Sequence, residues 1–184
     1  MLKNRDFSII SNNCWGGIVS QYYGLPYSSP TCGCEIKGSD YIKFCRNIHY
    51  YLSLKFQFID FENSKYRYLY EGFKPFPVGK LDDIEVYFVH YHSEKEAAEK
   101  WYRRAKRINW NNIIFKMSHR ESYTEKDMED FASLDLPNKL IFDEKGSTYK
   151  TVIIPGITKL VGDETPLTFR YMNITKYLNS LIKR

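Results

Sequence analysis

The segment Phe7-Ser8-Ile9-Ile10-Ser11-Asn12-Asn13-Cys14-Trp15-Gly16-Gly17 decides our prediction of the fold. Residues 7–11 form a short apolar run with β-branched side chains, which is typical of a buried strand. The run ends at polar residues and a glycine pair, and apolar side chains then recur at helical spacing through residue 23. This stretch therefore predicts a strand, a tight turn and a helix.

The same alternation recurs further along the chain. Residues 84–91 read as a buried strand, and Ser93 with Glu96 forms a capping box that starts a helix ending near residue 107. Further predicted elements are a helix over 40–53, short antiparallel strands over 56–61 and 65–70, strands over 113–117, 139–142 and 151–154, a helix opened by Thr124 and Asp127, and a helix over 175–182. Strands that alternate with helices indicate a largely parallel sheet covered on both faces. We predict an α/β fold of three α/β/α layers with a mostly parallel or mixed sheet.

Length and composition narrow the class of protein. The chain has 184 residues, which fits a single domain over 1–184, and 43% hydrophobic against 27% charged residues exclude a disordered chain. No apolar run approaches the roughly 20 residues that a bilayer requires, and no signal-peptide pattern precedes the first strand. We therefore expect a cytoplasmic protein without a transmembrane segment, whose four cysteines stay reduced.

The net charge of +5 is spread along the chain, with one dense basic stretch at residues 100–107. Basic and aromatic residues together can indicate nucleic-acid binding. Here, however, Glu96 with Lys100 and Glu99 with Arg103 are ordinary helix pairs four residues apart. We expect a solvated helix face or a surface for an anionic ligand, with Arg103 and Arg104 as its candidates, and no nucleic-acid partner.

In open parallel sheets, ligands bind beyond the carboxyl ends of the strands, so the residues directly after each strand are the candidates for a site. They are Asn12, Asn13, Cys14, Trp15 and Gly16 after the first strand, His90 and His92 after the central strand, and His119 and Arg120 after the next. We predict that these residues share one edge of the sheet.

Cys14 stands where the first helix is predicted to begin. The positive end of a helix dipole lowers the pKa of a nearby thiol, so Cys14 is a candidate nucleophile. The same backbone amides would suit an oxyanion hole, with Asn13 contributing its side chain. The alternative is that Asn12 and Asn13 cap the helix while Cys14 packs in the core.

His90 and His92 flank Tyr91 at a predicted strand end, which places both imidazoles on one side. One of them is a candidate general base, although a strand-end histidine often only hydrogen-bonds a loop. A metal would need a third ligand, and the cysteines of the Cys32-Gly33-Cys34 segment lack zinc-site spacing. We therefore predict no metal site and name no cofactor.

Two further positions are candidate substrate contacts. His119 and Arg120 would bind a phosphate or carboxylate. Trp110, flanked by asparagines, has an aromatic ring on which a sugar could stack.

Several motifs together resemble a known family. They are Ile10 to Gly17, Pro30-Thr31, Asp40 to Phe44, Phe76 to Gly79, His90 to Glu94, Lys100-Trp101, Arg103-Arg104 and Arg107 to Trp110. The combination resembles the bacterial family catalogued as domain of unknown function 1919, whose members are often labelled exopolysaccharide or capsular polysaccharide biosynthesis proteins. The resemblance implies a three-layer α/β domain and a place in surface-polysaccharide synthesis or modification, and it assigns no residue a role.

Three functions follow as hypotheses. The first is a transferase that modifies a saccharide by acyl transfer, with His90 or His92 as base, Cys14 and Asn13 at the reacting group, and arginines holding an anionic donor. The second is a glycosyl or other group transferase that uses a nucleotide-linked donor. The third is a non-enzymatic assembly protein of the polysaccharide machinery, with the 16 tyrosines supplying an interface.

Overall fold

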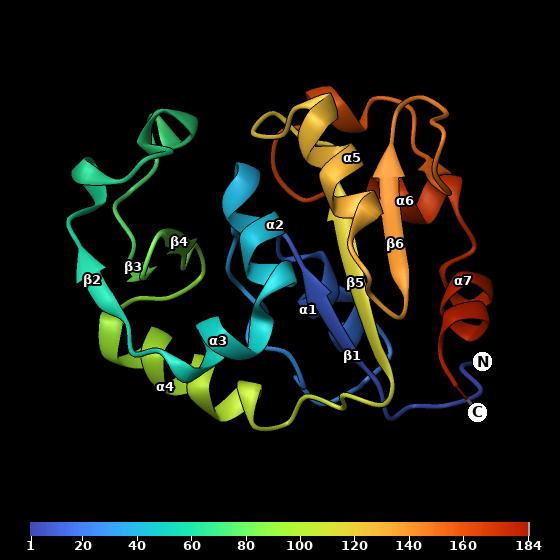
Figure 1. Ribbon diagram of the computed structural model, residues 1–184, viewed down its shortest axis with the longest axis horizontal. Coiled ribbons are helices and arrows are strands. Elements are labelled where there is room, and N and C mark those ends of the chain that lie inside the picture. Colours follow the sequence, from blue (N-terminus) through green and yellow to red (C-terminus); the bar gives the residue numbers. More distant parts are fainter. Residues whose placement is uncertain (184) are drawn as a thin grey trace.

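A four-stranded parallel sheet forms the centre of the computed structural model, which describes residues 1–183 (Figure 1). Its strands are β1 (Ser8–Ser11), β5 (Ile113–Ser118), β6 (Lys139–Asp143) and β7 (Val152–Ile153), in that spatial order. The register places Ser11 beside Lys116 and Ser118 beside Phe142, so the carboxyl ends of β1, β5 and β6 meet at one edge.

Helices cover both faces of this sheet. Ile9, Ile114 and Phe142 pack with α1 (Trp15–Tyr22), α6 (Thr165–Tyr171) and α7 (Ile174–Leu181) on one face. The alternate residues Ile10 and Phe115 pack with α2 (Gly38–Arg46) and α5 (Glu125–Ser133) on the other. The period-two alternation of side chains along a strand explains this division, and the predicted α/β class is confirmed.

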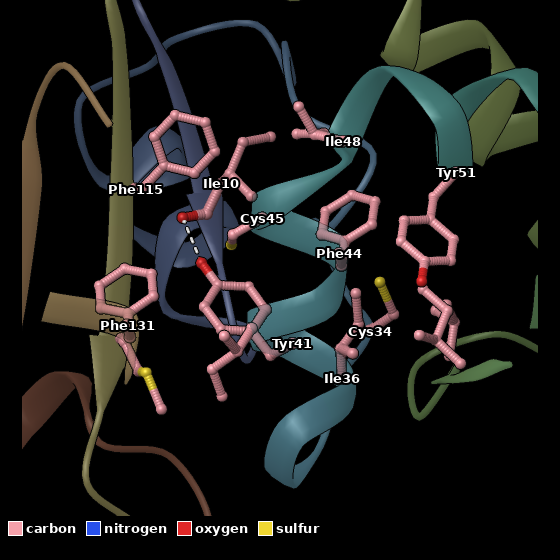
Figure 2. Close-up of a cluster of buried hydrophobic side chains, with 14 of the residues drawn as sticks. Ile10, Cys34, Ile36, Tyr41, Phe44, Cys45, Ile48, Tyr51, Phe115 and Phe131 are labelled. Atoms are coloured by element: carbon pink, nitrogen blue, oxygen red, sulfur yellow. Dashed lines mark hydrogen bonds between the residues drawn. The ribbon is translucent and has the colours of Figure 1, made fainter. Parts of the chain in front are cut away.

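Tyr41 of α2 connects the parallel sheet to helix α5 on the same face. Its hydroxyl donates to the Ile10 carbonyl at 3.1 Å, the bond drawn in Figure 2, and to the Lys116 carbonyl at 2.8 Å. Its ring stacks on Phe131 of α5 with centroids 5.7 Å apart. The core thus extends from β5 through α2 to Phe44 and onward to the second sheet.

That second sheet corrects one prediction. β2 (Gln57–Ile59), β3 (Val78–Leu81) and β4 (Ile84–Tyr87) form a separate antiparallel sheet, so the strand expected at the centre of the parallel sheet lies outside it (Figure 1). An apolar run shows that a strand is buried but not which strand it pairs with. Asp82 and Asp83, for which the sequence favours a turn, form the two-residue hairpin loop that pairs β4 with β3, with Asp82 at φ +57°.

Smaller differences concern element bounds. The helix expected over 40–53 breaks at Asn47 into α2 and α3 (Ile48–Ser53), and the segment expected to be a strand over 65–70 contains the 3₁₀ helix η2 (Arg67–Tyr70). Other elements are the 3₁₀ helices η1 (Phe61–Asn63) and η3 (Ile157–Lys159) and the capped helix α4 (Glu94–Ala105). Helix α6 was not predicted. Across residues 1–183, none of the helices combines the length and apolarity needed to cross a bilayer.

Candidate functional site

A cavity of about 410 Å³ opens where β1 and β5 end, and we call it the edge cavity. The rule that ligands gather at the carboxyl edge of a parallel sheet applies to this place. Its polar and aromatic lining includes Asn13, Cys14, Trp15, Glu35, Lys37, Tyr70, Phe73, His90, Arg120, Glu121, Asp163 and Glu164. Segments from both sheets therefore contribute to one hollow.

An ion pair lies beneath the edge cavity: Glu164 lines the cavity, and Lys116 lies behind it, outside the lining. We call this pair the floor. Lys116 lies in the middle of β5 with its side chain fully buried, and its ammonium is ion-paired with Glu164 Oε1. The same Nζ donates to Asn13 Oδ1 at 3.0 Å and to Asn12 Oδ1 at 3.3 Å. A charge in this position is tolerated only because each of these acceptors faces it.

Glu164 is only half satisfied. Oε1 accepts from Lys116 and from the Ser118 hydroxyl, the latter at 2.8 Å. Oε2 is buried and, among the described residues, has no hydrogen-bond donor; Arg120 Nη1 lies 3.5 Å from it. Buried carboxylate oxygens without a donor are costly, so this oxygen is an acceptor that a hydrogen-bond donor from water or a ligand would satisfy.

Burial and pairing set the protonation states at the floor. Burial lowers the pKa of the Lys116 ammonium to about 8, against the opposing effect of Glu164. Burial alone would raise the pKa of the Glu164 carboxyl, but the Lys116 charge outweighs it and the pKa lies below its usual range. At neutral pH, both groups are therefore charged.

A chain of alternating charges leads from the floor to the rim. Arg120 Nε lies 3.3 Å from Glu121 Oε2, and Lys37 Nζ contacts Glu121 Oε1 at 3.3 Å and Glu35 Oε2 at 3.0 Å. The Tyr70 hydroxyl donates to Glu35 at 2.7 Å. These groups hold one another in place, which gives the wall of the cavity a fixed pattern of donors and acceptors.

Cys14 lines the cavity, but the prediction that the start of the helix lowers the pKa of its thiol is wrong. Burial raises the pKa of the Cys14 thiol far above its ordinary value, and the Glu35 carboxylate adds to this effect. The thiol donates only weakly, at 3.9 Å, to the Cys34 carbonyl. The eight-residue helix α1 does not offset the desolvation, so the structure gives no support to a reactive thiolate.

The two candidate histidines have different places. His90 is exposed, follows β4 and lines the edge cavity beside Cys14. His92 is exposed and lies outside the lining, with its backbone N–H donating to Glu96 Oε2 at 3.0 Å next to the start of α4. His90 reaches the predicted edge even though its strand belongs to the other sheet.

The turn after β1 divides into ligand-facing and structural residues. Asn13 Oδ1 accepts from Trp15 N, Ser11 and Lys116, which leaves the amide NH₂ as the group that Asn13 offers to a ligand. Asn12 ties β1 to β5 through Ser118, and Gly16 allows α1 to approach Ile9, which a Cβ would meet at 3.0 Å. Trp15 is buried, donates to Thr168 at 2.9 Å and closes the base of the cavity.

His119 turns away from the edge cavity. Its Nδ1 lies 3.0 Å from Asp143 Oδ1. One ligand atom from each of His119, Glu125 and Asp143 lies within 4.8 Å of the other two. These three side chains are the group among the described residues that could ligate a metal. The His119–Asp143 hydrogen bond accounts for their approach without one.

The remaining candidates on α4 and beyond are separated. Arg103 is exposed and pairs with Glu99 at 3.0 Å, as predicted for a solvated helix face. Trp110 is 40% exposed and packs on His49 with ring centroids 4.2 Å apart, outside the lining of the edge cavity. Arg104 is buried and lines a second cavity, described below.

Comparison with known proteins gives the family of the chain. A family model described as "Domain of unknown function (DUF1919)" matches residues 1–179. The chain belongs to this family. One protein of Haemophilus influenzae, named "Uncharacterized protein", is 36% identical to this chain over 144 residues. That match covers 78% of this chain and 65% of the relative, so the chain spans slightly less than two thirds of the relative's length.

The sequence patterns did not predict the Lys116–Glu164 ion pair beneath the edge cavity of this DUF1919 protein. Lys116 stands in the apolar strand sequence Ile113-Ile114-Phe115-Lys116-Met117, and a lysine buried in such a strand requires a buried counter-charge. That signal was available, whereas its partner Glu164 lies 48 residues further along in a segment without a clear pattern. Glu35, Lys37 and Tyr70 also went unnoticed because their approach depends on the second sheet.

Proposed function

We propose that this protein is a transferase that moves an acyl group to a hydroxyl of a saccharide bound in the edge cavity. The observation that carries the proposal is Glu164 Oε2, a buried carboxylate oxygen with no donor, in a cavity at the carboxyl edge of the sheet. A sugar hydroxyl is a donor of the required kind. The label of polysaccharide biosynthesis that members of the family often carry agrees with this substrate class.

The charges of the lining favour a neutral, hydroxyl-rich ligand. Lys37 and Arg120 face four carboxylates, those of Glu35, Glu121, Asp163 and Glu164. Such a lining offers both donors and acceptors but repels an anion. Tyr70 and Phe73 add an aromatic wall, on which the apolar face of a sugar ring packs.

His90 is the group placed to act as general base. Its imidazole accepts the proton of the sugar hydroxyl as that oxygen attacks the acyl carbon of the donor. The new carbon–oxygen bond forms, the bond from the acyl carbon to the leaving atom breaks, and the leaving atom takes the proton from His90. The Asn13 amide stabilises the negative charge that develops on the acyl oxygen.

Binding is the first test. Saturation-transfer NMR with methyl glycosides of neutral hexoses, N-acetylated amino sugars and uronic acids should detect a neutral sugar on the wild-type protein. Phe73→Ala should weaken that binding, whereas Tyr68→Ala, an equally exposed aromatic outside the cavity lining, should not. Absence of binding across the panel, or equal loss in both variants, would contradict the saccharide site.

Transfer is the second test, made with the sugar that binds and an acetyl thioester, with the product followed by mass spectrometry. His90→Gln should lower the rate by about 10²–10⁴-fold, the usual contribution of a general base. His92→Gln is the matched control and should retain the wild-type rate. A sugar that binds but receives no acyl group would instead favour glycosyl transfer or a non-enzymatic assembly role.

A further inference from the structure

A second cavity of about 320 Å³ lies against α4, and we call it the α4 cavity. Three residues, Cys14, Ile18 and His90, line both this cavity and the edge cavity. The two hollows therefore meet at the proposed general base. Two compounds, one bound in each cavity, would bring their reactive ends together at His90.

The α4 cavity differs from the edge cavity in charge. Its charged lining residues are Lys100 and Arg104, and the described lining contains no carboxylate. Glu96 pairs with Lys100 at 2.5 Å but does not itself line the cavity. A hollow with two cations and no lining anion favours an anionic ligand.

Arg104 is held in position for such a ligand. It is 8% exposed, and its Nη1 donates to the Cys32 carbonyl at 2.8 Å and to the Tyr91 hydroxyl at 2.5 Å. Its guanidinium also lies over the Tyr27 ring, 4.7 Å from the centroid. These contacts engage one nitrogen and leave Nε and Nη2 to bind an anion in the planar geometry that suits phosphate.

We propose that the α4 cavity binds the phosphate groups of the donor substrate, a proposal that rests on the transferase function above. The donor class is a phosphate-bearing compound that carries the group to be transferred, with its phosphates at Lys100 and Arg104 and its reactive end at His90. The saccharide acceptor occupies the edge cavity on the other side of His90.

Calorimetry with two probes tests this assignment without the acceptor. Coenzyme A represents carriers of acyl thioesters, and uridine diphosphate represents nucleotide-linked sugars. The wild-type protein should bind one of them, and Lys100→Ala should weaken the binding by about tenfold, as expected for the loss of one charge-assisted contact. Binding of coenzyme A alone agrees with acyl transfer, whereas binding of uridine diphosphate alone replaces it with glycosyl transfer.

Arg103→Ala is the matched control, because Arg103 lies on the same helix with an exposed side chain paired to Glu99. It removes the same charge and should leave binding unchanged. Circular dichroism melting of both variants checks that the fold is retained. If both variants weaken probe binding equally, the loss reflects the change in net charge alone, and the assignment is overturned.

The result is separable from that of the saccharide test. Failure of both probes to bind would overturn the donor site while leaving neutral-sugar binding intact. Probe binding without any sugar binding would remove the acceptor site and retain an anion site at α4. As an independent readout, the imidazole NMR signals of His90 should shift with the bound probe, and those of His92 should not.

Discussion

Two buried carboxylates, one beside each sheet, differ in how completely the chain satisfies them. Beside the antiparallel sheet, Asp40 Oδ2 accepts from Glu85 N at 2.9 Å and from Lys65 at 3.0 Å, and Oδ1 accepts from Lys65 at 3.2 Å. At the carboxyl edge of the parallel sheet, Glu164 Oε1 has two donors, and Oε2 has none within residues 1–183. The first carboxylate is fully used in holding the fold, whereas the second has one oxygen that the described side chains leave without a donor. This unsatisfied oxygen lies in the cavity that we propose as the binding site.

The largest effect should come from breaking the floor of the edge cavity. Lys116→Met leaves the Glu164 charge buried without its partner, which should lower the free energy of unfolding by about 3–5 kcal/mol. Urea denaturation followed by circular dichroism measures this loss. The double variant Lys116→Met/Glu164→Leu should recover most of it, since both charges are then gone. A double variant as unstable as the single one would show that the pair is not the cause.

The second-largest effect should be a pH dependence of stability that comes from the Lys116–Glu164 pair. The pKa of Lys116 is about 8 in the folded protein and 10.5 ordinarily, so between these values the unfolded chain binds more protons than the folded one. The free energy of unfolding should therefore rise with pH across this window, by at most about 1.4 kcal/mol per pH unit. The difference between the wild type and Lys116→Met in urea denaturation isolates this slope. A difference that stays constant from pH 8 to 10 would contradict the lowered pKa.

The smallest effect is expected at the satisfied carboxylate. Asp40→Asn keeps the shape and some hydrogen bonds, and Lys65 is 42% exposed, so water can hydrate the released ammonium. The loss of unfolding free energy should be about 1 kcal/mol. Saccharide binding measured by NMR should not change, because Asp40 lies outside the edge cavity. Altered binding in this variant would mean that the two regions are coupled.

Local pattern predicted those parts of the fold that depend on neighbours in sequence. The strand, turn and helix around Asn13 and the helix starts at Ser93 and Thr124 appear where expected. Thr124 has a full capping box, whereas at Ser93 only the hydroxyl caps the helix, because the Glu96 side chain accepts from His92 N instead. The pairing of β4 was wrong because long-range strand partners leave little trace in a single apolar run. The two-residue loop Asp82-Asp83 indicates the true partner of β4, the preceding strand β3.

For the candidate site, the sequence predicted which residues share a cavity better than it predicted the state and partners of each side chain. Asn13, Cys14 and Arg120 share one cavity, as the rule for parallel sheets indicates, whereas His90 reaches that cavity from the end of β4 in the other sheet. The state of Cys14 was not predictable, since desolvation depends on the loop packed over it and not on the start of its own helix. His119 and Trp110 each find a partner close by, which residue type alone does not reveal.

The buried lysine of β5 also bears on how the chain is synthesised. Glu164 follows Lys116 by 48 residues, so the strand leaves the ribosome well before its counter-charge does. Until α6 arrives, an ammonium in the middle of the sheet has only amide and carbonyl oxygens to face, and β5 keeps access to water. The edge cavity therefore cannot be complete before residues 161–164, which line it, have been synthesised.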